Sequence, residues 1–573
     1  MTHDLEHPRA LGRPEAASSV EPEPGRRVSL SPRAWWLFGA ILVLAAALRL
    51  AQIGKLELWL DEVYSIHVAT SPAGVLREVA SDTNPPLYYG LLKLWIHGFG
   101  IGAGGVRSLS ALLGLAQLAA LGLWLKKALS PRAALWAMAF GALAPLHIYY
   151  AMEARGYTLA WLLLTLALWT FSRAVRSGGG RDWCVHAIVL LLFLYSHSLA
   201  LFFIPAFWLA ALAARLRRRG WAWLLALQGA AGVLYLPWLI SSLRLLGALG
   251  RSWIDLTLES ASFAFAIPRT LELLGIGARM PEMIRLSSPG PLVRSLWQIL
   301  LGLILVAAAL PRGRRRGWPR QAAPALIFLF TPLLLMLGYS LFVRPIYIAG
   351  RYDTLVYPAY LALIGLGLSR LQKIIPLSQT TAALILAALL AVLAFFALEL
   401  RYRPLPAQPL HHPQQARGDV LARFIQPGDW VVCLGLEGAK IEYQMLRHGL
   451  KEPMLTFPLA TRGHLGWFNP QEVAAQPALL EADAQTILDP FTPPRPRHGR
   501  LWVMMDPYSF RPAAPGGEEA AYGAISAVLL RAIAARGLKP AADPDLARSC
   551  RNLGIRVYER PPNNDSSTTN QLR

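Results

Sequence analysis

Two adjacent carboxylates, Asp61 and Glu62, follow an apolar leader made of Leu58, Trp59 and Leu60. They come just after the first long apolar segment, where we expect the chain to have left a lipid bilayer. Carboxylates at a membrane surface are costly to keep unless they bind or react with something. A carboxylate in this place can take the proton from an attacking hydroxyl group. We therefore interpret Asp61 as the reactive group of a membrane enzyme.

Other loops on the predicted outer side also carry charged or hydrogen-bonding residues. If the apolar segments form a bundle, these loop ends can converge on one cavity. Arginine suits such a site because its paired donors can bind a departing phosphate. The candidate residues outside the first pair are Asp82, Glu153, Arg155, His197, Arg351 and Tyr352.

Each of these residues also has a plainer interpretation. The first acidic pair could be a solvated helix start, and Asp82 could be a turn or cap residue. Glu153 and Arg155 could neutralise each other in a tight turn. His197 could be an interfacial histidine, and Arg351 an arginine that extends from a helix end toward water.

The composition places the chain in a membrane. It has 573 residues, of which 54% are hydrophobic and 16% charged, which is less charge than a soluble chain of this length carries. A net charge of +22 could indicate a nucleic-acid-binding protein. However, the Arg and Lys residues cluster in short loops between apolar runs, as membrane topology requires. We therefore expect contacts with anionic lipids and none with nucleic acid.

The apolar runs predict a polytopic all-α membrane domain over residues 34–400, preceded by a disordered cytoplasmic segment, residues 1–33. About eleven runs approach the length that spans a bilayer, and the basic clusters between them fall on one side. That pattern puts the N-terminus in the cytoplasm and the loops 54–105 and 241–290 outside. The predicted spans are 34–53, 106–125, 133–150, 156–171, 183–196, 199–214, 221–240, 292–310, 322–343, 352–371 and 380–400.

After Leu400 the composition becomes that of a soluble domain. Runs at 430–434 and 501–505 are typical of buried strands, and helical spacing lies between them. We therefore predict a small extracytoplasmic α/β domain over 401–560 and a disordered tail, 561–573. The three cysteines are too few for a disulfide scaffold, although Cys433 and Cys550 could pair with each other.

The sequence resembles the polyprenyl-phosphate-dependent GT-C glycosyltransferases of bacterial membranes, which include protein O-mannosyltransferase and aminoarabinose transferase relatives. The order and loop placement of several motifs carry this resemblance, which covers roughly residues 34–400. The motifs are Trp59-Leu60-Asp61-Glu62, Asp82-Thr83-Asn84-Pro85-Pro86-Leu87-Tyr88-Tyr89, Tyr150-Ala151-Met152-Glu153-Ala154-Arg155-Gly156-Tyr157, Tyr195-Ser196-His197-Ser198 and Gly350-Arg351-Tyr352.

The resemblance implies an inverting transfer of a sugar from a polyprenyl-phosphate-linked donor on the outer face of a bacterial inner membrane. By this likeness Asp61 is the general base. The other residues of the motifs bind donor and acceptor, with Arg351 and Tyr352 at the phosphate. A divalent cation such as Mg²⁺ or Mn²⁺ could be held by Asp61, Asp82 and Glu153. The implied binding residues are Glu62, Asp82, Glu153, Arg155, Tyr157, His197, Arg351 and Tyr352.

The residues leave other functions open. A transporter or lipid flippase of the cell envelope would also have many spans and outer charges, although it usually places ionisable groups near the bilayer centre on broken helices. A non-catalytic partner in an envelope complex would tolerate substitution of every outer acid. The sugar stays unassigned, and the acceptor could be a glycolipid, a polysaccharide or a protein.

Overall fold

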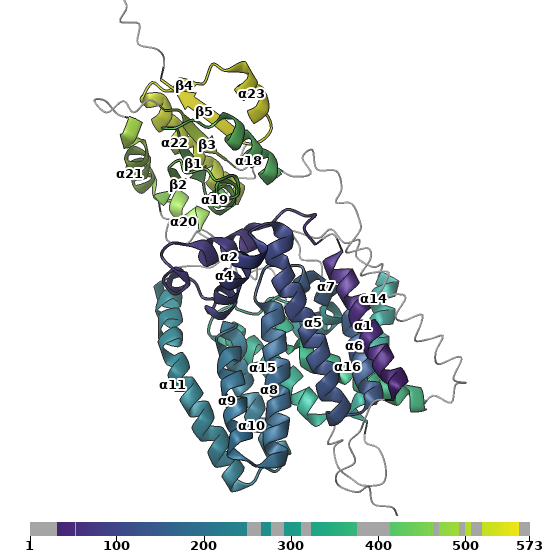
Figure 1. The fold of residues 1–573 in the computed structure, drawn as a ribbon. Coiled ribbons are helices and arrows are strands. Elements are labelled where there is room, and N and C mark those ends of the chain that lie inside the picture. The colour runs from purple at the N-terminus through teal and green to yellow at the C-terminus, as the bar shows by residue number, and fades with distance from the viewer. Residues whose placement is uncertain are drawn as a thin grey trace, which may run out of the picture.

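The computed structural model describes residues 31–51, 53–248, 265–276, 291–310, 322–374, 413–459, 461, 469–491, 499–505 and 518–560. The chain forms a long helical bundle and, beyond one end of it, a smaller part built on a sheet (Figure 1). The expected span 380–400, most of the expected loop 241–290 and nearly all of both terminal segments lie outside the described residues.

Within the described residues, six helices are long and apolar enough to cross a membrane, or seven if the bent pair α6–α7 counts as one. The protein is therefore a multi-pass membrane protein. The expected spans 183–196, 199–214 and 292–310 fall on helices that do not meet that criterion, so the number eleven stays a prediction. The bundle consists of α1 (Pro32–Leu50), α5 (Ala103–Ala128), α6 (Pro131–Leu143), α7 (Pro145–Ala151), α8 (Tyr157–Ser177), α9 (Gly180–Leu194), η2 (Ser198–Phe203), α10 (Ile204–Ala213), α11 (Arg218–Ala248), α13 (Ala266–Ile276), α14 (Pro291–Ala309), α15 (Ala323–Phe342), η4 (Asp353–Val356) and α16 (Tyr357–Ile374).

Helix α16 lies at the centre of the bundle, packed between α6 and α14. Membrane helices associate closely where small residues face each other. A Cβ atom on Gly365 would come within 2.3 Å of the Ala133 carbonyl oxygen on α6, and one on Gly367 within 2.2 Å of the Ile304 carbonyl oxygen on α14. These glycines let three backbones approach, and so fix the short helix η4 that precedes α16.

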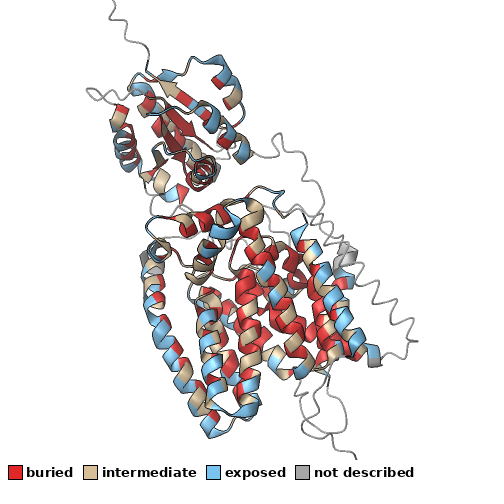
Figure 2. Cartoon of the chain, in the orientation of Figure 1, coloured by how far each residue is buried: buried red, intermediate tan, exposed pale blue. Residues whose placement is uncertain are grey.

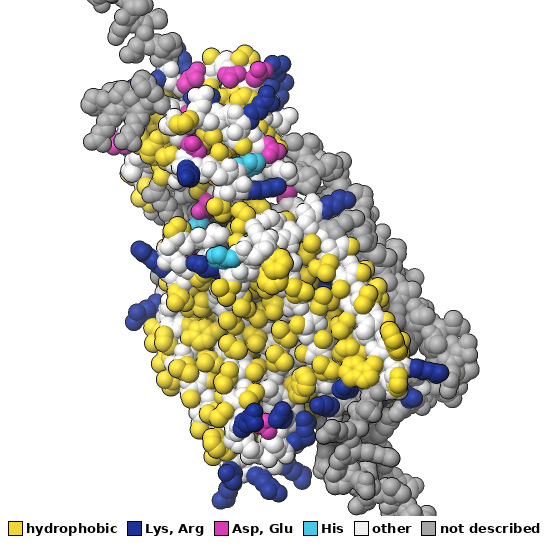
Figure 3. All heavy atoms as spheres, in the orientation of Figure 1, with side chains coloured by type: hydrophobic (Ala, Val, Ile, Leu, Met, Phe, Trp, Pro, Cys, Tyr) yellow, Lys and Arg dark blue, Asp and Glu magenta, His cyan; other side chains and the backbone are white. Residues whose placement is uncertain are grey.

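The outer surface of the bundle is apolar and suited to lipid. Trp36, Val43, Val233 and Phe342 are all more than two-thirds exposed. Exposed residues follow the outer helices α1 and α11 (Figure 2), and apolar side chains cover most of the visible bundle face (Figure 3). Lys and Arg side chains gather at the end of the bundle far from the sheet (Figure 3), where the exposed run 217–219 lies.

A buried arginine closes the break between α6 and α7, whose axes differ by 64°. Pro145 has no N–H to offer the Gly141 carbonyl, so the break leaves a backbone acceptor without its helical partner. The fully buried Arg49 on α1 donates to the carbonyl oxygens of Gly141 and Ala142, at 3.0 Å each, and to Nδ1 of His147 at 3.0 Å. The chain after this break, α7, leads directly to the turn that carries Glu153 and Arg155.

A layer of short helices covers the end of the bundle nearest the sheet (Figure 1). It comprises α2 (Leu60–Thr70), α3 (Val75–Glu78), η1 (Val79–Ser81) and α4 (Leu87–Phe99). Helix α4 has Pro86 as its N-cap residue and Gly100 as its C-cap residue. The expected outer loop 54–105 is therefore largely helical, and it places Asp61 in the first turn of α2.

Residues 413–560 form a five-stranded sheet with helices on both faces. Strands β1, β2 and β3 are parallel, and β5 runs antiparallel to β3 and β4, giving the order β2-β1-β3-β5-β4. Side chains alternate along β1: Val432 packs with α21 and α22, whereas Val431 packs with α18 and α19. The elements are α18 (Pro413–Phe424), β1 (Trp430–Leu434), α19 (Glu437–His448), β2 (Met454–Phe457), α20 (Pro470–Ala474), α21 (Pro477–Leu488), η6 (Asp489–Phe491), β3 (Leu501–Met504), α22 (Glu518–Ala535), β4 (Lys539–Pro540), α23 (Pro544–Cys550) and β5 (Ile555–Glu559).

Strands β1 and β3 lie where buried strands were expected. Cys433 and Cys550 are both buried in the core on the α18–α19 side of the sheet, yet both are free thiols. The disulfide that their presence allowed is therefore not formed.

Helix α19 rests on α2, the helix that carries Asp61. His67 on α2 lies 2.8 Å from the Glu442 carboxylate on α19. The Gln415 backbone N–H donates to Glu57 at 2.8 Å, and the Tyr443 hydroxyl donates to the Ile101 carbonyl at 3.4 Å. The sheet-containing part is thus in direct contact with the segments on both sides of Asp61.

Candidate active site

Asp61 meets two arginines that come from distant turns of the bundle. Its Oδ2 lies 2.5 Å from Nη2 of Arg351, in the turn before α16, and 3.8 Å from Nη2 of Arg155, in the turn before α8. All three side chains are mostly buried, with 20%, 15% and 10% exposure respectively. The structure therefore brings together one acid and two guanidinium groups at the end of the bundle near the sheet.

Glu62 is fully buried and bonded on both carboxylate oxygens. Its Oε1 accepts from Arg107 Nε at 2.7 Å and from the Ala154 backbone N–H at 2.9 Å. Its Oε2 accepts from Arg107 Nη2 at 2.7 Å and from the Trp59 N–H at 3.2 Å, where Glu62 caps α2. Glu62 therefore joins the start of α2 to the turn that carries Arg155, so we assign it a positioning role instead of the substrate contact expected from the sequence.

Arg107, in the first turn of α5, completes this junction. Besides its two bonds to Glu62, it donates to the backbone carbonyl oxygens of Ile53, Leu56 and Glu57 at 2.7 to 3.1 Å. Every donor group of the guanidinium thus has a partner. Arg107 was not among the residues predicted from the sequence, although an arginine next to an apolar span is a signal that could have found it.

Arg155 is held on its other side by a chain of hydrogen bonds. Its Nη1 donates to the Tyr89 hydroxyl at 3.4 Å, and that hydroxyl donates to Asp82 Oδ2 at 3.1 Å. Asp82 Oδ1 accepts from the side chain of Asn84 at 3.0 Å. Asp82, predicted to bind substrate, is therefore connected to Arg155 through Tyr89, a residue that the sequence analysis quoted only within a motif.

Glu153 is a buried acid with one oxygen still available. Its Oε1 accepts from the Tyr149 hydroxyl at 3.3 Å. Among the described residues, Oε2 has no hydrogen-bond partner. Burial, together with the nearby charge of Glu62, raises the pKa of Glu153 from 4.5 to about 8. The group is therefore mainly neutral at pH 7 and can donate a hydrogen bond there.

His197 is a capping residue with a neutral ring. Its Nδ1 accepts from the Leu199 backbone N–H at 3.2 Å at the start of η2. Burial, and then the positive charges of Arg155 and Arg351, lower the pKa of His197 to about 3. Its ring centroid lies 6.0 Å from those of Tyr157 and Tyr352, so these three predicted site residues form one aromatic wall.

Arg351 is fixed by its neighbours. The Tyr150 hydroxyl on α7 donates to the Gly350 carbonyl at 2.5 Å. The Arg351 guanidinium carbon lies 5.8 Å from the ring centre of Trp59 and 5.6 Å from that of Tyr352. Cation–π contacts of this kind hold a guanidinium while leaving its edge available for an anion.

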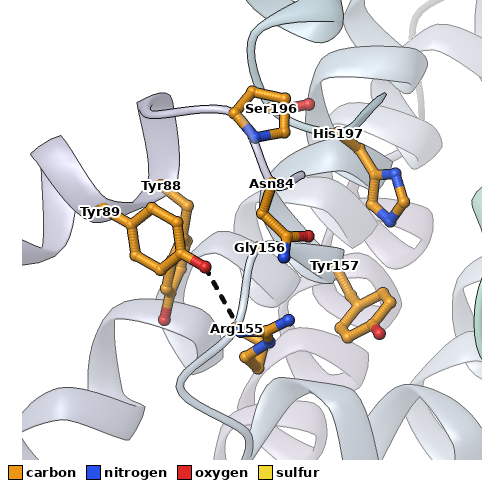
Figure 4. Close-up of a pocket in the computed structure, with 9 residues that line it drawn as sticks. Asn84, Tyr88, Tyr89, Arg155, Gly156, Tyr157, Ser196 and His197 are labelled. Carbon is orange, nitrogen blue, oxygen red and sulfur yellow. Dashed lines mark hydrogen bonds between the residues drawn. The ribbon is translucent and has the colours of Figure 1, made fainter. Parts of the chain in front are cut away.

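A small cavity opens between these side chains. Asn84, Tyr88, Tyr89, Arg155, Tyr157 and His197 surround it from three directions, with Arg155 below the tyrosine rings and joined to Tyr89 (Figure 4). Its volume of about 20 Å³ has room for little more than one water molecule. Asp61 and Arg351 are not among the residues that line it.

The three carboxylates proposed as metal ligands do not form a cluster. Asp61 faces arginines, and Asp82 bonds to Asn84 and Tyr89. Over the described part of the chain, no group of three or more His, Cys, Asp or Glu residues is arranged to hold a metal ion. The residues present do not fit the predicted cation site.

Comparison with known proteins identifies the fold. No protein-family model and no curated protein matches the sequence. Among solved structures, ArnT from Cupriavidus metallidurans bound to undecaprenyl phosphate superposes with a TM-score of 0.54 at 14% identity, over 93% of this chain and 99% of that one. The apo form of ArnT gives 0.56 at 14% identity, over 92% and 98%.

The oligosaccharyltransferase of Archaeoglobus fulgidus, in complex with zinc and sulfate, is also similar. Its TM-score is 0.52 at 12% identity, over 92% of this chain and 74% of that one. Both proteins are GT-C glycosyltransferases. The predicted GT-C membrane fold is therefore confirmed, whereas the roles of individual residues still depend on the geometry above.

Proposed function

We propose that the protein is an inverting glycosyltransferase that moves a sugar from a polyprenyl-phosphate-linked donor to an acceptor. The convergence of Asp61 with Arg351 and Arg155 carries this proposal. A general base and two phosphate-binding cations are the groups that such a transfer needs. The shared fold with ArnT, whose structure contains undecaprenyl phosphate, supports the same class of donor.

Each group has a defined part in the reaction. Asp61 takes the proton from the acceptor hydroxyl, whose oxygen forms a bond to the anomeric carbon. The bond between that carbon and the phosphate oxygen breaks on the opposite face, and its electron pair leaves with the lipid phosphate. Arg351 and Arg155 stabilise the departing charge. Neutral Glu153 offers a hydrogen bond to a sugar hydroxyl, and Asp82 orients Arg155 through Tyr89.

The proposed orientation puts this site outside the cytoplasm of a bacterial inner membrane. A cluster of exposed Lys and Arg side chains lies at the opposite end of the bundle (Figure 3), and the positive-inside rule assigns the end with such a cluster to the cytoplasm. The sheet-containing part, in contact with α2, is then extracytoplasmic. The acceptor is a glycolipid, a polysaccharide or a protein of the cell envelope.

Substitution of Asp61 tests the proposal. We expect purified Asp61→Asn to lose sugar transfer from a polyprenyl-phospho-sugar donor while keeping the melting temperature of the wild type. Glu481→Gln, an exposed change on α21, is the matched control and keeps full transfer. A well-folded Asp61→Asn protein with normal transfer would end the assignment of the base.

A transporter is the second candidate, favoured by the broken helix α6–α7 and the intramembrane Arg49. Transporters often bind their cargo at such breaks. Here, however, Arg49 bonds to the carbonyls at the break and so closes it. Transfer measured in detergent, without any ion gradient or sealed vesicle, distinguishes the two functions, because a transporter would form no new glycosidic bond.

A further inference from the structure

We propose that Asp61 occupies the phosphate position of the donor in the resting enzyme, and that the arriving lipid phosphate displaces it from Arg351 and Arg155. The proposal rests on the function proposed above and adds a mode of regulation to it. The base would become available only after the donor has bound.

The first support is the geometry of the ion pairs. Asp61 Oδ2 points at Nη2 of both arginines, at 2.5 and 3.8 Å. Carboxylates and phosphates offer guanidinium groups the same arrangement of oxygen acceptors. An anion placed between Arg351 and Arg155 must therefore compete with this carboxylate for the same N–H groups.

The second support is chemical. In this arrangement the Oδ2 lone pairs that would receive the acceptor proton face guanidinium N–H groups. A general base must be within hydrogen-bond reach of the hydroxyl that it deprotonates. The resting geometry therefore commits Oδ2 to the arginines, and a phosphate bound in its place would release this oxygen for the acceptor hydroxyl.

The third support is that the two arginine side chains are held by neighbouring residues, whereas the Asp61 side chain is more exposed. Arg155 is held by Tyr89, and Arg351 lies against the rings of Trp59 and Tyr352. Asp61 sits at the first turn of α2 with a fifth of its side chain exposed. The carboxylate is therefore the most exposed of the three groups and the one that can rotate away.

Displacement of the Asp61 carboxylate by the lipid phosphate makes an unusual prediction for lipid binding. Undecaprenyl phosphate, without a sugar, is titrated onto detergent-purified full-length protein by isothermal calorimetry. Asp61→Asn removes the internal competitor, so we expect it to bind this lipid more tightly than the wild type by roughly two- to tenfold, the factor available from a partly buried ion pair. An ordinary substrate-binding residue would give weaker binding when changed.

A double-mutant cycle separates displacement from a general effect of charge. Arg351→Gln should weaken lipid binding, and adding Asp61→Asn to it should recover little, because the competed N–H groups are gone. Glu78→Gln, which removes a carboxylate from the same layer of short helices without touching either arginine, serves as the charge control and should tighten binding far less. Asp61→Ala is the second variant if Asp61→Asn melts early.

Three results would overturn the proposal that the lipid phosphate displaces Asp61. Unchanged or weaker lipid binding by both Asp61 variants would show that the carboxylate does not compete. Equal tightening by Asp61→Asn in the presence and absence of the Arg351 side chain, or equal tightening by Glu78→Gln, would show a general charge effect. If the wild type binds no undecaprenyl phosphate but still transfers sugar from another donor, the assigned donor class fails and the exchange fails with it.

Discussion

The Asp61 carboxylate lies 2.5 Å from the Arg351 guanidinium, although 290 positions separate the two residues in the chain. The contact joins the first turn of α2 to the turn before α16. Arg155, from the turn before α8, approaches the same oxygen at 3.8 Å. Three turns thus meet at one acid, and each arginine can be tested separately.

Changing Arg351 to lysine should impair catalysis more than folding. Lysine keeps the charge but loses the planar pair of donors and the stacking on Trp59. We expect kcat to fall about 10²-fold, the typical loss when one transition-state donor is removed, with a melting temperature close to that of the wild type. Steady-state transfer kinetics measure the effect.

Arg173→Lys is the control for this change. Arg173 is two-thirds exposed and pairs with Asp182, and its substitution should leave kcat unaltered. If Arg351→Lys transferred sugar at the normal rate, Arg351 would not be stabilising the leaving phosphate.

Breaking the Glu62–Arg107 pair should destabilise the fold. The two side chains are about 1% and 6% exposed, and removal of one partner leaves the other charged and buried. Such changes cost about 3–5 kcal/mol, so Glu62→Gln and Arg107→Met should each melt well below the wild type in detergent. Glu481→Gln is again the exposed control.

The double variant that carries both Glu62→Gln and Arg107→Met tests whether the two residues stabilise the fold together. Because the double variant leaves no uncompensated charge, it should melt higher than the sum of the single losses implies. Strict additivity would mean that the two residues contribute independently, contrary to the contacts described above.

The convergence of Asp61, Arg155 and Arg351 could be anticipated from the sequence, because all three follow or precede apolar spans on the same predicted side. Their partners could not. The bonds from Arg107 to Glu62 and from Arg49 to His147 join helices that are separated by 45 and 98 positions in the chain, and no local pattern specifies their packing. Glu62 therefore looked like a second substrate acid, although burial gives it a positioning role.

The limits of the helices were predictable to different degrees. The ends of helix α4 are marked in the sequence itself, by Pro86 before it and Gly100 after it. The break at Pro145 was missed inside an expected continuous span, 133–150. An apolar run shows hydrophobicity and length, whereas the bend is stabilised by Arg49 from another helix, which sequence periodicity does not reveal.

The contact between His67 and Glu442 should make docking of the sheet-containing part depend on pH. Burial alone would lower the pKa of His67, but the hydrogen bond and charge of Glu442, with Glu78, outweigh it and raise the pKa above 6.5. The stabilisation is therefore complete below the ordinary pKa and is lost as pH rises through the raised value. Hydrogen exchange across residues 60–70 should increase over that range.

Glu442→Gln should remove most of this pH dependence, because the charge that holds the imidazolium is gone. Glu452→Gln, a change nearby on the same part of the chain, should keep it. If the backbone amides of α2 in the wild type were equally protected from hydrogen exchange at all pH values, the His67 contact would not contribute to docking.

The free energy of unfolding should also depend on pH through Glu153. As with His67, the stabilisation is lost as pH rises, but here the protonated group is a neutral acid and not a charged base. Its pKa is raised from 4.5 to about 8 because burial penalises the charged carboxylate. The folded state then holds a proton that the unfolded chain has released, so the free energy of unfolding should fall as pH rises from about 4.5 to about 8.

Glu153→Gln mimics the neutral acid and should flatten this part of the curve, raising the melting temperature most at the alkaline end. Melting of both proteins from about pH 5 to about pH 9 measures the difference, with Glu481→Gln expected to follow the wild type. Parallel curves for wild type and Glu153→Gln would mean that Glu153 is ionised in the folded protein, and that it receives hydrogen bonds from the sugar instead of donating one.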